Sequence, residues 1–206
     1  LDEHIFNLNK SLKKLNIPFS LTSDKLFDLM PHNLRTKKYD HLLRVAIKKN
    51  ILSLSLRPRL RPKKNFQCTL VNYQRSNPSI KNLHYKKILS LQKGIDMQKE
   101  EIIFFHNKNL LEGSTTNLIV IKNNNIFLPK GNFYRGITLD FILSKIGKDY
   151  SNKFIKFADL ESADEIILVG SGKGVINVSS IPSIKWFSSS SKMFNRLLAI
   201  YKEQLK

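Results

Sequence analysis

The stretch Leu111-Glu112-Gly113-Ser114-Thr115-Thr116-Asn117-Leu118-Ile119-Val120-Ile121 decides how this 206-residue chain is expected to fold. A single acidic residue, Glu112, precedes a turn of small residues, and the turn leads directly into an apolar run that predicts a buried strand. A carboxylate beside a buried strand must be paired with a cation, or its pKa rises and it becomes neutral. Glu112 is therefore expected to have a cationic partner, with Lys81 as a candidate. The alternative is an exposed Glu in a hairpin turn.

The composition is that of a basic globular protein. Hydrophobic residues make up 41% of the chain, which is enough for an ordinary core. Lys and Arg number 35 against 16 Asp and Glu, so the net charge is +19. Such a charge permits nucleic-acid binding and also speeds the encounter with a small anion. The basic residues are scattered and Asn is abundant beside them, which favours a general compositional bias toward Lys, Asn and Ile over nucleic-acid binding. We therefore expect a small anionic substrate rather than a nucleic acid.

Cysteine content and hydropathy limit the kinds of site and the cellular compartment that we expect. Cys68 is the only cysteine, which excludes a disulfide framework and a cysteine-based metal site. No apolar run approaches the roughly 20 residues of a membrane span. We therefore expect a cytoplasmic protein with no metal and no membrane contact. The chain begins at Leu1 without a leader, so we expect a fragment or a processed form.

Strands and helices alternate along the chain, which predicts an α/β or α+β fold. Helices are expected at 2–16, 22–29, 81–93, 139–146 and 190–205; strands are expected as a hairpin at 43–56 and at 66–73, 102–105, 118–121, 126–128, 166–169, 175–181 and 184–187. Two prolines and five cations at 57–64 predict an exposed linker, with an anion-binding arm as the alternative. The linker divides a small N-terminal domain, 1–62, from a larger C-terminal domain, 63–206.

Two glycine-containing segments could bind an anion. Gly136-Ile137-Thr138 precedes a helix, where free backbone N–H groups and the helix dipole attract phosphate. Gly170-Ser171-Gly172 follows a buried strand, and its small residues would let a ligand approach the backbone. Neither signal is specific. The second segment is more often a plain turn than an anion site, and the spacing G-x-x-x-x-G-K-[ST] of a P-loop is absent.

Four motifs, taken in order, resemble the class IV aminotransferases. They are Lys81-Asn82-Leu83-His84-Tyr85, Glu-Gly-Ser-Thr-Thr-Asn-Leu at 112–118, Gly136-Ile137-Thr138, and Ala163-Asp164-Glu165 followed by Gly170-Ser171. This family of fold-type IV pyridoxal-phosphate enzymes includes branched-chain aminotransferases, D-amino-acid aminotransferases and aminodeoxychorismate lyases. The resemblance implies a small N-terminal α/β domain whose first strands would precede Leu1, a larger mixed-sheet domain, and a homodimer with its active site near the interface.

The resemblance also implies pyridoxal 5′-phosphate as the cofactor. Lys81 would form a Schiff base with it and move a proton at the substrate carbon. Glu112 would bond the pyridine nitrogen, so that a pyridinium rather than Lys81 would be its cationic partner. Tyr85 would contact the ring hydroxyl, while backbone N–H groups and the Ser171 hydroxyl would hold the phosphate. The full set of expected cofactor-binding residues is Lys81, Tyr85, Glu112, Ser114, Thr115, Thr116, Asn117, Gly136, Ile137, Thr138, Gly170 and Ser171.

Two departures from the family pattern bear on function. Asn7 stands where the family commonly has a phosphate-clamping Arg, so cofactor affinity should be lower unless another cation replaces it. The stretch 184–191 lacks the Gly-Pro that transaminases usually carry there, which is more similar to the lyases. The resemblance then implies conversion of 4-amino-4-deoxychorismate to 4-aminobenzoate and pyruvate, a step of folate synthesis. The alternatives are a branched-chain or D-amino-acid aminotransferase and a non-catalytic basic binding protein.

Overall fold

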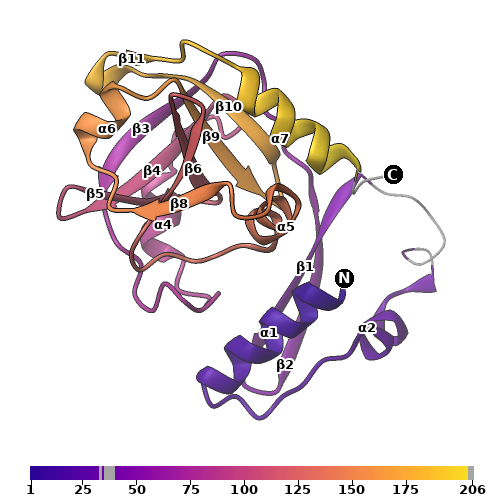
Figure 1. Ribbon diagram of the computed structural model, residues 1–206. Helices are drawn as coiled ribbons and strands as arrows, with labels where there is room; N and C mark the ends of the chain where they lie inside the picture. Colours follow the sequence, from indigo (N-terminus) through magenta and orange to yellow (C-terminus); the bar gives the residue numbers. More distant parts are fainter. Residues whose placement is uncertain (33, 35–39, 204–206) are drawn as a thin grey trace. The chain divides into compact units, whose positions relative to one another are not determined.

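A computed structural model describes residues 1–32, 34 and 40–203, and it forms two compact units (Figure 1). The first unit consists of Leu1–Arg59 and Ile80–His84. The second consists of Leu60–Ser79 and the chain from Tyr85 onward. The short segment that carries Lys81 therefore belongs to the first unit, although the residues on both sides of it belong to the second.

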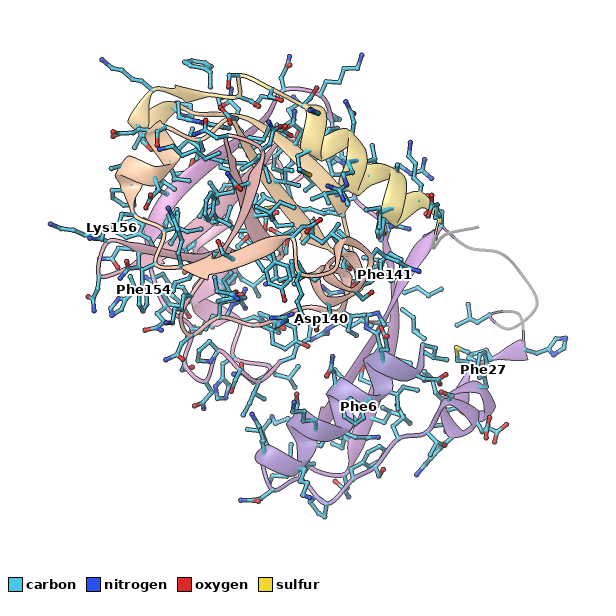
Figure 2. All side chains as sticks on the ribbon, in the orientation of Figure 1. Phe6, Phe27, Asp140, Phe141, Phe154 and Lys156 are labelled. Carbon is cyan, nitrogen blue, oxygen red and sulfur yellow. The ribbon has the colours of Figure 1, made fainter. Side chains whose placement is uncertain are left out.

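The first unit packs two helices against a hairpin. Helix α1 (Asp2–Lys14) and helix α2 (Ser23–Leu29) precede strands β1 (His41–Lys48) and β2 (Ile51–Pro58), which pair in antiparallel fashion. Their shared core consists of Ile5, Leu21 and Leu26, against which Leu8, Phe19, Leu43, Val45 and Leu54 pack. Phe6 on α1 and Phe27 on α2 instead point outward and are exposed (Figure 2).

The second unit is built on one mixed sheet. Its strands are β3 (Phe66–Asn72), β4 (Glu100–His106), β5 (Asn109–Gly113), β6 (Asn117–Lys122), β7 (Asn125–Pro129), β8 (Tyr150–Lys153), β9 (Glu165–Gly170), β10 (Gly174–Ile181) and β11 (Trp186–Phe187). They lie in the order β5-β4-β3-β10-β9-β6-β7-β8, with β11 paired to β10. Strand β3 is parallel to β4 and β10, and β7 is parallel to β8. The sheet curls until the Leu110 N–H donates to the Ile155 carbonyl at 2.8 Å, just beyond β8.

Strand β6 shows why the sequence folds this way. Leu118 and Val120 point into one hydrophobic cluster, whereas Ile119 and Ile121 point into another. Neighbouring β9 alternates in the same way at 166–169. Side chains alternate across a strand, so an unbroken apolar run buries both faces of the sheet. These two strands therefore form the centre of the unit.

Helices cover the sheet. Helix α5 (Ile137–Ile146) and helix α7 (Lys192–Glu203) pack on the cluster that contains Ile119, and Figure 1 shows α7 running beside β10. Helix α6 (Phe157–Glu161) and the 3-10 turn η1 (Pro182–Ile184) contribute to the opposite cluster. Helix α4 (Lys86–Leu91) places Ile88 against Phe104. None of the helices in the described residues is long and apolar enough to cross a membrane.

The structure corrects several predicted elements. The helix expected at 81–93 spans only Lys86–Leu91, because the Asn82 side chain accepts the His84 N–H at 2.9 Å and offers the backbone an alternative to helix. Arg57 and Pro58, which were expected in the linker, belong to β2 and pair with residues of β1. Strand β8 was missed because its four residues show no apolar alternation. At 184–187 only a two-residue strand forms, after η1.

The ends of two helices also differ from expectation. Helix α5 begins at Ile137 rather than Leu139, because Gly136 provides the extended N-cap. Helix α7 begins at Lys192 rather than Ser190. The predicted C-terminal end of that last helix, Leu205, lies outside the described residues.

Glu165 gives a first testable prediction, because this buried carboxylate on β9 caps α7. Its Oε1 accepts the Met193 N–H at 2.8 Å, and its Oε2 accepts the Phe194 N–H at 2.7 Å. Glu165→Ala leaves these N–H groups without an acceptor and should lower the free energy of unfolding by about 2 kcal/mol. Chemical denaturation measures the loss. Glu203→Ala, at the exposed end of the same helix, is the control, and an equal loss in both variants would contradict the capping role.

Candidate active site

Glu112 is buried at the end of β5, with 4% of its surface exposed. The exposed-hairpin alternative is therefore wrong. Its partner is Arg75, which follows β3 and donates from Nε to Oε1 at 2.8 Å. The second carboxylate oxygen, Oε2, accepts the Tyr134 N–H at 3.3 Å. Burial raises the pKa of Glu112 to about 7, even though the charge and hydrogen bond of Arg75 act in the opposite direction.

Sequence reasoning missed Arg75. It lies beyond the predicted strand 66–73 and belongs to none of the four motifs. Its guanidinium also donates from Nη2 to the Ser114 carbonyl at 2.6 Å and lies 5.7 Å from the ring centre of Phe104. The signal that could have found it is the demand for a cation beside Glu112, since Arg forms such buried pairs more readily than Lys.

The turn after Glu112 has no room for a larger residue at its start. The Gly113 N–H donates to the Thr116 carbonyl at 2.9 Å, and the Ser114 N–H donates to the Ile102 carbonyl at 2.8 Å. A Cβ at position 113 would lie 2.1 Å from Thr116 Oγ1. This turn, residues 113–116, is called the Glu112 turn below.

Asn117 connects the Glu112 turn to the loop before α5. Its Oδ1 accepts the Gly136 N–H at 2.9 Å, and its Nδ2 donates to the Tyr134 carbonyl at 2.6 Å. A Cβ on Gly136 would lie 2.8 Å from Asn117 Oδ1, so this approach requires glycine. Because Tyr134 also donates its N–H to Glu112, the loop before α5 is tied to the buried carboxylate.

The two predicted anion-binding segments come together at the start of α5. Thr138 Oγ1 and Ser171 Oγ are 3.1 Å apart. The first N–H groups of a helix have no acceptor within it, and the N-cap Gly136 supplies no side-chain acceptor. A Cβ on Gly170 would lie 3.1 Å from the Thr115 carbonyl oxygen, so the second segment also lies close to the Glu112 turn. Gly136–Thr138 with Gly170 and Ser171 form one candidate anion site.

An ion pair lies beside this site. Arg135, which precedes the helix, forms an ion pair with Asp140 in the first turn of α5. Burial and the neighbouring phenol of Tyr85 raise the pKa of Tyr134. In the part of the chain that the structure describes, no three His, Cys, Asp or Glu side chains gather to hold a metal ion.

Lys81 and Tyr85 fall in different units. Tyr85 is the N-cap of α4 in the second unit, which also holds Glu112 and the candidate anion site. Lys81 belongs to the first unit, where burial and then the charge of Lys81 lower the pKa of His4 on α1. The second unit thus brings together the predicted residues from Tyr85 to Ser171, and Lys81 is not among them.

A family model identifies the chain. The model "Amino-transferase class IV" matches residues 1–181. This chain belongs to the class IV aminotransferase family. It is thus a class IV aminotransferase-like enzyme, with the mixed α/β fold that the four motifs predicted.

Individual proteins of known sequence or structure show how far the similarity extends. A Methanocaldococcus jannaschii protein named "Putative branched-chain-amino-acid aminotransferase" is 25% identical over 88% of this chain and 73% of its own length. The crystal structure of a "Putative 4-amino-4-deoxychorismate lyase" from Legionella pneumophila superposes with a TM-score of 0.81 at 20% identity, covering 98% of this chain and 84% of that one. A Brucella abortus aminotransferase bound to the co-factor PLP superposes with a TM-score of 0.75 at 19% identity, covering 98% and 82%.

The raised pKa of Glu112 predicts a pH dependence of stability. Between its ordinary value of 4.5 and about 7, folded Glu112 keeps a proton that the unfolded chain releases. Without added cofactor, the free energy of unfolding should therefore fall by about 3 kcal/mol as pH rises through this window. Urea denaturation as a function of pH measures the fall, which should be absent in Glu112→Gln and present in the exposed-site control Glu203→Gln. The same pH dependence in both variants would contradict the assignment.

Proposed function

We propose that this chain binds pyridoxal 5′-phosphate (PLP) at the site described above. The observation that carries the proposal is the network joining a buried carboxylate, Glu112, to an anion site through Tyr134, Asn117 and Gly136. PLP carries a basic pyridine nitrogen at one side and a phosphate at another, so it needs both a buried carboxylate and an anion site. The residues present fit the group.

Each residue at the site then has a proposed task. The Ile137 and Thr138 N–H groups and the Ser171 hydroxyl would hold the phosphate. Glu112 Oε2, whose capacity is only partly used by the 3.3 Å bond from Tyr134, would hold a proton at the pyridine nitrogen. Arg75 would keep Oε1 in place. When bound, PLP supplies an electron sink for a carbanion at the substrate carbon.

The remaining predicted residues would shape the site or act on the substrate. Ser114, Thr115, Thr116, Asn117, Gly136 and Gly170 would fix the loops by the hydrogen bonds and close backbone approaches described above, and Tyr85 would contact the ring hydroxyl. Lys81 would bind the cofactor covalently and move the proton at the substrate carbon. Its assignment rests on the family motif, Lys81-Asn82-Leu83-His84-Tyr85.

The cofactor proposal predicts a spectrum. Purified protein with added PLP should show a visible absorbance band that is absent in Lys81→Ala, because the band requires a covalent link to the amine. Lys86→Ala, which removes an exposed lysine on α4, is the matched control and should keep the band. If the wild-type protein and Lys86→Ala show no band beyond that of Lys81→Ala, Asn7 in place of the usual Arg prevents cofactor binding. The non-catalytic binding protein then becomes the better hypothesis.

For the reaction, we propose the lyase that converts 4-amino-4-deoxychorismate to 4-aminobenzoate and pyruvate. The support is the stretch 184–191, which lacks Gly and Pro, together with the net charge of +19, which suits a dianionic substrate. The name of the Legionella pneumophila structure agrees. A branched-chain aminotransferase is the second candidate, favoured by the name of the Methanocaldococcus jannaschii relative. On family resemblance alone we also propose that the chain is a cytoplasmic homodimer. Sedimentation equilibrium would measure the mass of the assembly.

The two activities differ in whether they need an amino acceptor. A lyase should release pyruvate and fluorescent 4-aminobenzoate from 4-amino-4-deoxychorismate with no 2-oxo acid present. An aminotransferase should release neither and should instead convert a branched-chain amino acid only when a 2-oxo acid is added. Lys81→Ala should abolish whichever activity is found. Turnover of the amino acid without pyruvate release would replace the lyase by the aminotransferase.

A further inference from the structure

A second buried carboxylate contacts two of the turns that form the candidate site. Glu101 on β4 is 1% exposed, and its Oε2 accepts Lys173 Nζ at 2.7 Å. Lys173 is itself buried, with 5% of its side chain exposed, in the turn between β9 and β10. This turn, residues 170–174, also carries Ser171 and is called the Ser171 turn below. Neither charged residue belongs to the motifs that resemble the family.

The other oxygen of Glu101 binds the Glu112 turn. Oε1 accepts the Thr115 N–H at 2.6 Å, the Thr115 hydroxyl at 2.8 Å and the Ser114 hydroxyl at 3.2 Å. Ser114 Oγ in turn accepts from Gln92 Nε2 at 2.8 Å. One carboxylate therefore bonds both turns at once, the Glu112 turn through Oε1 and the Ser171 turn through Oε2.

We propose that Glu101 and Lys173 are a positioning pair that fixes the Glu112 turn relative to the Ser171 turn. This inference rests on the proposed function. In that function the pair sets the distance between the Glu112 carboxylate, which would bond the pyridine nitrogen, and the Ser171 hydroxyl, which would bond the phosphate. The pair acts through Thr115 and Ser114 on one side and through the backbone of Lys173 on the other. It is a positioning pair and not a catalytic one.

The pair connects residues that lie beyond the ends of the paired strands. Strands β6 and β9 are paired from Asn117 opposite Val169, but residues 114–116 and 171–173 lie beyond the ends of the strands. Among the described residues no strand pair joins residues 114–116 to residues 171–173, although the Ser114 N–H still bonds to the Ile102 carbonyl on β4. A buried ion pair adds little net stability because the loss of hydration offsets the attraction, but its directional bonds select one arrangement.

The test compares variants in the protein without cofactor and then with it. Lys173→Met removes the link but leaves Glu101 buried without its cation, so the double variant Glu101→Gln/Lys173→Met is made as well. In the double variant, Gln still offers Thr115 an acceptor while the bond to position 173 is lost. Lys153→Met is the matched control, since Lys153 forms a 2.8 Å ion pair with Asp159 in the same unit but contacts neither turn.

Amide hydrogen exchange without cofactor should become faster in both turns of the double variant and stay at the wild-type rate in the control. In a PLP titration, the dissociation constant of the double variant should rise about tenfold, as when outer-shell partners of a bound metal are removed. The visible band should also shift. A purely structural pair would instead lower the melting temperature while leaving exchange in the turns and PLP affinity unchanged.

Wild-type exchange in both turns of the double variant, together with wild-type PLP affinity, overturns the proposal. Faster exchange in only one turn also overturns it, because a positioning pair must act on both. If the wild-type protein itself binds no PLP, the proposed function fails, and the exchange comparison, which needs no cofactor, still decides whether the pair couples the two turns.

Discussion

A charge cannot be buried without a partner, and this constraint organises the second unit of the chain. Glu112 and Glu101 lie on neighbouring strands, β5 and β4, and both are almost fully buried. Each one needs a cation and several donors to offset its lost hydration. Arg75 and Lys173 supply the cations, from segments far away in the sequence. The segments around the candidate site therefore converge because two carboxylates must be satisfied.

The apolar centre of the second unit adjoins these polar groups. Strands β6 and β9 bury apolar side chains on both faces, so they leave no place for a polar side chain until they end. The polar residues gather where the strands stop, at the Glu112 turn and the Ser171 turn. A site on loops held by a packed sheet keeps its geometry without giving up access to a ligand. The family relationship and the proposed cofactor both agree with this arrangement.

Much of the fold could be predicted from local pattern. The apolar runs at 118–121 and 166–169, the Asn-rich turns and the helix at α5 were recognisable because each is specified by neighbouring residues. The helix expected at 81–93 was too long, because the side chain of Asn82 competes for the backbone. Strand β8 could not be predicted from its own residues, because it forms by pairing with β7 rather than through an apolar pattern.

The sequence by itself determined the family, the strands that form the core, and the demand that Glu112 be paired. The residue types within each motif, the order of the motifs along the chain and the local apolar pattern are enough for these, since none of them depends on which distant segments come into contact. Only the tertiary structure decided that Arg75 is the cation beside Glu112, that Thr138 and Ser171 meet, and that Glu101 and Lys173 join two turns. These contacts span up to 72 positions and depend on strand order. A one-dimensional pattern contains no information on which distant strands become neighbours, and that is what sets the partner of a buried charge.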